Sequence, residues 1–418
     1  MAAPHRGAAG RAGRRERTGP VTGALEAAVG RHRTRSRRER IVGVDAARAV
    51  ALVGMFATHI FPLREGREPT LTGMIASGRA SALFAVLAGV GVALATGGMQ
   101  RPRGTRAHLG AGAALVVRGA LVAAVGLTLV ATRAPVAIIL AYYGVLFVVA
   151  AFLVRVPRGL LAAGAVLACV LTPVASQLLR EGMPEGPGAQ VGWPALAAPG
   201  NAVVTLVLTG YYPVLTWTTY LLAGMAVGRL DLRRPQVATG LLVGGAALAV
   251  AAHTASALLL GPGNGVWVLG AAASERRYGT TPTGTWWWLA VDTPHSGSTL
   301  DLAATTGSAL AVLGTMLLLS RWAPRVVLVP AALGSAPLTL YTLHVVALAW
   351  YAGRGSDDLV LWLGHVLAAT LVGLALRFAG VRGPLEAVLS AAGRAVRRLV
   401  TGITPKAVDS DPPRPPGT

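Results

Sequence analysis

The feature that most constrains this chain is a series of apolar segments, each about twenty residues long, that recurs between residues 41 and 379. Segments of this length cross the hydrocarbon of a bilayer as helices, because helices satisfy their own backbone polar groups in lipid. Hydrophobic residues make up 53% of the 418 residues and charged residues 13%, which leaves too little polar surface to cover a soluble particle. The sequence therefore predicts an all-α, polytopic integral membrane helix bundle.

About ten transmembrane helices are predicted, and arginine orients them, because short loops rich in Lys and Arg stay in the cytoplasm. The spans lie near residues 41–62, 78–97, 110–130, 134–154, 159–179, 204–228, 237–260, 302–320, 327–351 and 359–379. Every second loop is basic, with Arg101, Arg103, Arg106, Arg155, Arg158, Arg229, Arg233, Arg234, Arg321 and Arg325. We therefore expect both termini in the cytoplasm and the longer connections, 180–203 and 261–301, outside.

Four regions are expected along the chain. Residues 1–40 are rich in Arg, Gly and Ala and lack apolar periodicity, which is typical of a disordered basic cytoplasmic tail. Residues 41–380 form the transmembrane domain, whose first segment is too long for a cleavable signal peptide. Residues 381–402 predict an amphipathic cytoplasmic helix on the anionic inner leaflet, and residues 403–418 a disordered Pro-rich tail.

Composition also argues against several classes of function. The net charge of +21 comes from tails and alternate loops, so no nucleic-acid partner is expected. The single cysteine, Cys169, permits neither an intrachain disulfide nor a cysteine metal site, and no metal is expected. Hydrolase, nucleotide-triphosphatase and zinc-site motifs are missing. The expected surroundings are the lipids of a bacterial plasma membrane. Abundant Gly and Ala allow close packing of helices without specifying an interface, so a homo-oligomer stays open.

Arg48 and His59 are ionisable residues inside the first apolar segment, where a central Arg costs roughly 2.5–3.5 kcal/mol. Helical residues eleven positions apart, at about 100° per residue, lie on nearly the same face and about 16 Å apart along the axis. The pair therefore predicts one wall of a polar cavity. A structural ion pair between Arg48 and Asp45, one turn earlier, is the alternative.

Polar residues of the other spans fall into two layers. Arg48 and Arg118 form an inner layer, nearer the cytoplasm, whereas the outer layer contains His59, Arg79, Tyr211, Tyr212, Tyr341 and His344. Arginine binds phosphate through paired hydrogen bonds, and imidazole transfers protons near neutral pH. The layering suggests an anionic cofactor that enters from the cytoplasm, with chemistry at the outer side. His253 and His365 have no motif support and are interpreted as structural.

Several motifs resemble membrane acyltransferases. Arg48 and His59 match the pattern of arginine or lysine, ten residues, then histidine found in acyltransferase-3 proteins, which acylate cell-surface sugars. The surrounding RIVGVDAARAVALVGMFATHIFP is similar to the opening of bacterial relatives of heparan-α-glucosaminide N-acetyltransferase. Five later segments resemble the same proteins: SGRASALFAVLAG at 77–89, TGYYPVLTWTTYLLAGMAVGRLDL at 209–232, TPHSGS at 293–298, PLTLYTLH at 337–344 and GPLE at 383–386.

The resemblance implies an enzyme that moves an acyl group, most simply acetyl, from cytoplasmic acyl-CoA to a hydroxyl or amine of an extracytoplasmic glycan, lipid-linked sugar or glycosylated metabolite. His59 and Arg48 would be catalytic, with His59 as general base or acyl carrier. The implied CoA ligands are Arg48, Arg118 and Arg79, and the implied acceptor ligands are Tyr211, Tyr341, His344, Asp292 and His295.

Other interpretations remain open from sequence alone. Asp292, His295 and Ser296 also resemble part of a hydrolytic triad. A transporter or exporter is the competing class, because intramembrane Arg and His suit a substrate or proton path. An inverted repeat or paired broken helices would favour a transporter, and no convincing repeat is present in the sequence. A non-catalytic scaffold is disfavoured by the many ionisable groups within the spans.

Overall fold

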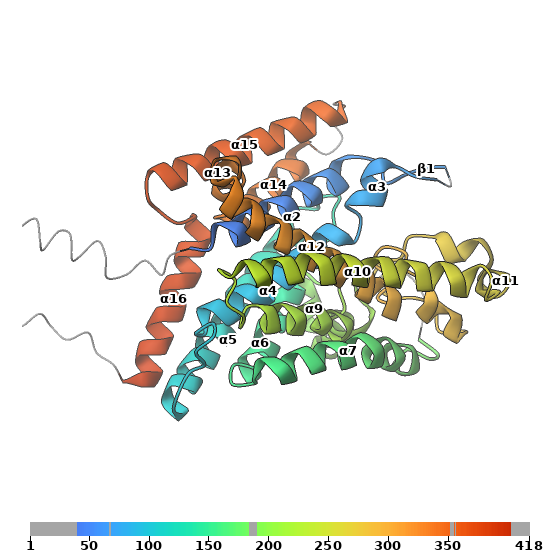
Figure 1. The fold of residues 1–418 in the computed structure, drawn as a ribbon, viewed down its shortest axis with the longest axis horizontal. Coiled ribbons are helices and arrows are strands. Elements are labelled where there is room, and N and C mark those ends of the chain that lie inside the picture. Colours follow the sequence, from blue (N-terminus) through green and yellow to red (C-terminus); the bar gives the residue numbers. More distant parts are fainter. Residues whose placement is uncertain (1–39, 67, 184–189, 352–354, 356, 403–418) are drawn as a thin grey trace, which may run out of the picture. The chain divides into compact units, whose positions relative to one another are not determined.

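Helices supply almost all of the regular structure in the computed structural model, which describes residues 40–66, 68–183, 190–351, 355 and 357–402 (Figure 1). The first half contains α2 (Val42–Ile60), α3 (Leu71–Ile75), α4 (Arg79–Ala95), α5 (Thr105–Val130), α6 (Leu140–Phe152), α7 (Arg158–Leu179), η1 (Trp193–Ala197) and α8 (Pro199–Val204). The second contains η2 (Thr205–Thr209), α9 (Val214–Val227), α10 (Pro235–Leu260), α11 (Gly265–Leu269), η3 (Gly270–Ser274), η4 (Trp286–Ala290), α12 (Thr299–Trp322), α13 (Pro324–Leu333), α14 (Pro337–Tyr351), α15 (Asp358–Phe378) and α16 (Pro384–Thr401). A short antiparallel ladder joins β1 (Arg64–Glu65) to β2 (Glu68–Pro69).

Membrane-spanning helices confirm the predicted fold class. In the part of the chain that the structure describes, seven helices are long and apolar enough to cross a membrane, or eight if the bent pair α13 and α14 forms one span. Each of the ten predicted spans contains helix, but α6 is short and two others are interrupted. The number of spans and the side of the termini therefore stay predictions.

The two interruptions have local causes. Residues 204–228 form the π-helical turn η2, then an extended Gly210, and α9 starts only after Pro213. Residues 327–351 bend by 59° between α13 and α14, where Pro337 starts the second helix. Proline disfavours helical backbone in the preceding residue and lacks an N–H, so neither segment continues as one helix.

Burial separates an inner set of helices from an outer set. About half or more of the apolar stretch is buried in α2, α4 and α12, against 22% in α7 and α10 and 11% in α15. Close packing inside depends on glycine, because a Cβ added to Gly224 of α9 would lie 2.0 Å from the Val86 carbonyl oxygen of α4. The helices α2, α4 and α12 therefore form the centre of the bundle, whereas α7, α10 and α15 lie at its periphery.

Hydrogen bonds join the arginine-rich loops at one end of the bundle. Arg101 donates to the Arg155 carbonyl at 2.7 Å, and buried Arg229 donates to the Val154 carbonyl at 2.6 Å. Arg321 donates to the Arg233 carbonyl. The loops that the sequence assigns to the cytoplasm thus lie at the same end of the bundle. The positive-inside rule requires this, because all of these loops must face the same side of the membrane.

Accessibility of single cysteines should establish which side that end faces. In a Cys169→Ala background, we expect cysteine at Arg103 or Arg234 to resist an impermeant thiol reagent in intact cells and cysteine at Gly284 to react. Gly284 is exposed and has open space around an added Cβ, so the reporter should not perturb the fold. Labelling at Arg103 in intact cells would reverse the orientation.

Candidate functional site

A polar pocket of about 370 Å³ lies at the end of α2 that carries His59. Its polar lining includes His59, Gln190, Tyr211, Arg276, His295 and Tyr341. Four of these were candidates from sequence, whereas Gln190 and Arg276 were missed, because they lie in connections without a recognisable motif. We refer to this cavity as the outer pocket.

Three histidines from three helices form a hydrogen-bonded chain that starts at this pocket. His59 Nδ1 of α2 lies 3.1 Å from His344 Nε2 of α14, and His344 Nδ1 lies 3.0 Å from His365 Nδ1 of α15. Phe56 stacks on the buried His344 ring at 4.0 Å. Neutral imidazole has one donor nitrogen and one acceptor nitrogen, so the hydrogen bonds of the chain all run in the same direction. A proton added to one ring therefore changes which nitrogens of the neighbouring rings donate and accept.

His365 was interpreted from sequence as structural, yet it completes the chain. Its only sequence signal was an imidazole within an otherwise apolar span. His344, an implied acceptor ligand, is 3% exposed and contacts His59 rather than the outer pocket. Within the described residues, no cluster of His, Cys, Asp and Glu forms a metal-binding group.

His295 enters the outer pocket from a tightly held loop. Its backbone is left-handed, with φ of 60°, an unusual conformation for a residue other than glycine. Its carbonyl accepts from the Gly279 N–H at 2.8 Å, and the Gly297 N–H donates to Asp301 at 3.0 Å. Burial, with a smaller contribution from Arg276, lowers the pKa of His295 to about 3, so the ring is neutral at physiological pH.

The lowered pKa of His295 predicts a loss of stability in acid. Because the unfolded chain takes up this proton near pH 6.5 and the folded chain only near pH 3, stability is present above pH 6.5 and falls as the pH drops towards 3. We expect the melting temperature in detergent to fall more steeply between pH 6.5 and 4 for the wild type than for His295→Asn. Asparagine also tolerates the left-handed backbone. Parallel curves would contradict this assignment.

A second cavity, of about 210 Å³, contains the predicted inner layer, and we call it the inner pocket. Arg48 and Arg118 line it, together with Glu386 of α16. Arg48 also pairs with Asp45 at 2.7 Å, so the predicted ion pair is confirmed and coexists with a position in a cavity. Arg118 lies over the Phe147 ring at 5.3 Å, and among the described residues its buried Nε has no hydrogen-bond partner.

Glu386 was not a candidate from sequence, although it ends the GPLE motif. Its carboxylate accepts from the backbone N–H of Leu338 at 2.7 Å and of Thr339 at 3.1 Å, and from the Thr339 hydroxyl at 2.6 Å. A carboxylate at a helix N-terminus complements the helix dipole. Glu386 therefore holds the start of α14. Arg118 has no ion pair with a carboxylate among the described residues, although it lines the inner pocket beside Glu386. Within the predicted amphipathic segment, residues 381–402, the structure has α16, which packs along α5 (Figure 1), whereas its place on the cytoplasmic leaflet stays a prediction.

The two pockets are neighbours on the same helices. On α4, Ser81 lines the outer pocket and Phe84 lines the inner one. On α14, Tyr341 lines the outer pocket and Leu338 lines the inner one. The positions in each pair are three residues apart, which is nearly one helical turn and about 4.5 Å along the axis. The buried Tyr341 hydroxyl has no partner among the described residues, so it is available for a ligand at this boundary. A flexible ligand held in the inner pocket could thus place its end beside the outer one.

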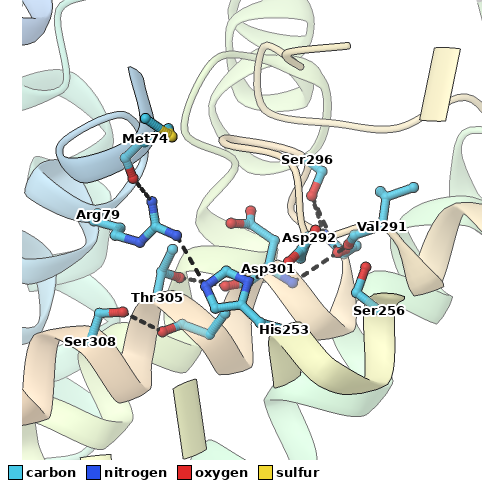
Figure 2. Close-up of polar contacts among 12 residues, drawn as sticks. Met74, Arg79, His253, Ser256, Val291, Asp292, Ser296, Asp301, Thr305 and Ser308 are labelled. Carbon is cyan, nitrogen blue, oxygen red and sulfur yellow. Dashed lines mark hydrogen bonds and ion pairs between the residues drawn. The ribbon is translucent and has the colours of Figure 1, made fainter. Parts of the chain in front are cut away.

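Arg79 and Asp292, two further candidates, lie outside the lining of both pockets. Arg79 Nη2 lies 3.0 Å from His253 Nε2, and its Nη1 donates to the Met74 carbonyl. Asp292 pairs with the other ring nitrogen of His253 (Figure 2). The structure thus gives both charges a protein partner, and His253 was missed because its partners are 39 and 174 residues away.

A cationic inner pocket below a histidine-lined outer pocket, within an apolar helix bundle, defines an integral membrane protein with an internal binding site. The chain belongs to the family described as heparan-alpha-glucosaminide N-acetyltransferase, catalytic, whose model matches residues 40–258, more than half of the chain. Membership implies an acetyltransferase. No curated protein matches the chain significantly.

The matched region runs from α2 to α10 and contains Arg48, His59 and Arg118. His295 and His344 lie beyond it. These two residues reach the site through tertiary contacts rather than through the matched segment.

Proposed function

We propose that the protein transfers an acetyl group from cytoplasmic acetyl-CoA to a hydroxyl or amine of an extracytoplasmic glycan, lipid-linked sugar or glycosylated metabolite. One observation carries the proposal: the arginine-lined inner pocket and the histidine-lined outer pocket lie nearly one turn apart on shared helices. The family match supplies the acetyl transfer. The basic loops at the inner end favour a cytoplasmic donor.

The inner pocket suits the phosphate end of the donor. Arg118 offers a buried Nε without a protein partner, and Arg48 offers a second guanidinium beside Gly91, whose added Cβ would lie 3.1 Å from it. Guanidinium groups bind phosphate oxygens through paired, charge-assisted hydrogen bonds. Arg79 is not included in this donor site, because its guanidinium is held by Met74 and His253.

His59 is the proposed general base. It takes the proton of the acceptor hydroxyl or amine, whose oxygen or nitrogen then attacks the thioester carbonyl carbon. The carbon–sulfur bond breaks, and the thiolate leaves and regains a proton. His344 accepts the His59 Nδ1–H and stabilises the imidazolium that forms, while His365 receives the His344 Nδ1–H. An acyl-histidine intermediate on His59 is the alternative route.

The acceptor is proposed to occupy the outer pocket. Tyr211, Tyr341 and Gln190 supply hydroxyl and amide groups for hydrogen bonds to a sugar, and the Arg276 guanidinium lies 5.2 Å from the centre of the Tyr278 ring. Such a mixture of aromatic and polar groups is typical of small-ligand sites. The pocket does not distinguish O-acetylation from N-acetylation, because His59 could deprotonate either nucleophile.

A transporter is the second candidate, and the two interrupted spans favour it. The breaks at Gly210–Pro213 and between α13 and α14 are of the kind that transporters use at a midplane site. Purified protein in lipid nanodiscs, mixed with radiolabelled acetyl-CoA and a panel of sugars, separates the two classes. We expect acceptor-dependent release of CoA thiol and label on the sugar. Sugar binding without any acetylation would favour the transporter.

A further inference from the structure

His253 lies on α10, a helix at the periphery of the bundle that supplies none of the described residues lining the outer pocket. Its ring nevertheless connects two parts of the chain that do reach the pocket. One nitrogen lies 3.0 Å from Arg79, at the start of α4, and the other pairs with Asp292, in the segment before α12. Figure 2 shows the imidazole between these two charged side chains.

Hydrogen-bond chemistry fixes the state of this ring. Arg79 can only donate, so His253 Nε2 must be the unprotonated nitrogen and accept. Nδ1 then carries the proton and donates to the Asp292 carboxylate. A single neutral tautomer satisfies both bonds, whereas an imidazolium would direct an N–H at the guanidinium. His253 is therefore a neutral connector between a cation and an anion.

Each end of the connection adjoins a wall of the outer pocket. Gly78, Ala80 and Ser81, on either side of Arg79, line the pocket, and Asp292 lies three residues before His295, which also lines it. The two walls touch, because a Cβ added to Gly78 would lie 3.2 Å from the Pro294 side chain. Moving either anchor would therefore shift groups that face the acceptor.

Arg79 also needs an external partner for electrostatic reasons. It is the first residue of α4, where the helix dipole disfavours a cation. The Met74 carbonyl and His253 contact the guanidinium, and Asp292 supplies a compensating negative charge at the other nitrogen of the His253 ring. Without His253, the Arg79 and Asp292 side chains lose the group that fixes their positions relative to each other.

We propose that His253 is a positioning residue, which acts through Arg79 and Asp292 to hold the start of α4 and the His295 loop as a preformed acceptor-binding surface. The expected effect on the acceptor KM rests on the proposed function. The expected effect on the α4 start and the His295 loop can be measured without any reaction. The inner pocket is lined by other residues, and none of Arg79, His253 and Asp292 contributes to it.

Two substitutions separate a specific role from general packing. His253→Leu removes both hydrogen bonds, whereas His253→Gln keeps one donor and one acceptor about as far apart as the ring nitrogens and cannot ionise. We expect His253→Leu to raise KM for the acceptor about tenfold or more and to leave acetyl-CoA binding unchanged. His253→Gln should restore most of the loss. Thr254→Leu, on the exposed neighbouring position, is the matched control and should behave as wild type.

Hydrogen–deuterium exchange gives the reading that is independent of catalysis. We expect faster exchange in residues 76–81 and 291–298 of His253→Leu, but wild-type exchange in His253→Gln and in the rest of the bundle. Unchanged exchange in both segments, or equal loss for the Leu and Gln variants, would overturn the proposal. Faster exchange as expected, in a protein that acetylates no acceptor, would instead overturn the proposed function and retain the positioning role.

Discussion

Replacing His59 with alanine is expected to reduce acetyl transfer by about 10²–10⁴-fold while acetyl-CoA binding stays nearly intact. His59 is the imidazole that both lines the outer pocket and leads into the histidine chain, through its 3.1 Å contact with His344. His59→Gln should fail similarly, because an amide forms hydrogen bonds but takes up no proton at neutral pH. Single-turnover transfer of radiolabelled acetyl groups in nanodiscs measures the effect.

The matched control is His108→Ala, since His108 lies on α5 outside the lining of both pockets. It should retain wild-type transfer. If His59 carries the acetyl group itself, acid quenching should trap labelled wild-type protein and no labelled His59→Ala. Full transfer by a well-folded His59→Ala protein would refute the mechanism and direct attention to His295, the other imidazole of the outer pocket.

Removing the Arg118 guanidinium is expected to weaken acetyl-CoA binding about tenfold or more, since one charge-assisted hydrogen bond is worth on the order of 1.5–3 kcal/mol. Its Nε has no protein partner among the described residues, so Arg118→Ala removes a ligand contact without breaking a protein hydrogen bond at that atom. Arg118→Lys should recover part of the loss, because lysine keeps the charge but not the paired donors. Calorimetry with purified protein measures the dissociation constants.

Arg48→Ala should weaken binding as well, but with an added cost in stability. Asp45 is 7% exposed and would lose the 2.7 Å ion pair with Arg48. Melting temperatures measured beside the titrations separate the two effects. Arg103→Ala, on an exposed loop at the same end, is the control for net charge. Wild-type affinity in both pocket variants would exclude the inner pocket as the donor site.

Local pattern was sufficient for the class of protein and for part of the site. Length and apolar content predict membrane helices because the bilayer imposes a fixed thickness on every span. The spacing of Arg48 and His59 within one helix predicts a shared face, and both residues line cavities in the structure. The family resemblance was also readable from motifs, and the family match confirms it. These features depend on residues close together in sequence.

Tertiary structure alone decided which polar groups meet. His59 and His344 are 285 residues apart, and His253 and Arg79 are 174 apart, so no periodicity relates them. The sequence predicted Arg79 as a CoA ligand, whereas in the structure its guanidinium contacts His253. His253 and His365 were interpreted as structural, whereas His365 belongs to the histidine chain that starts at His59. The physical reason is that a helix sets the face on which a side chain lies, but the packing of helices decides which faces oppose one another. In this protein, the partners of the buried charges and imidazoles are set by that packing.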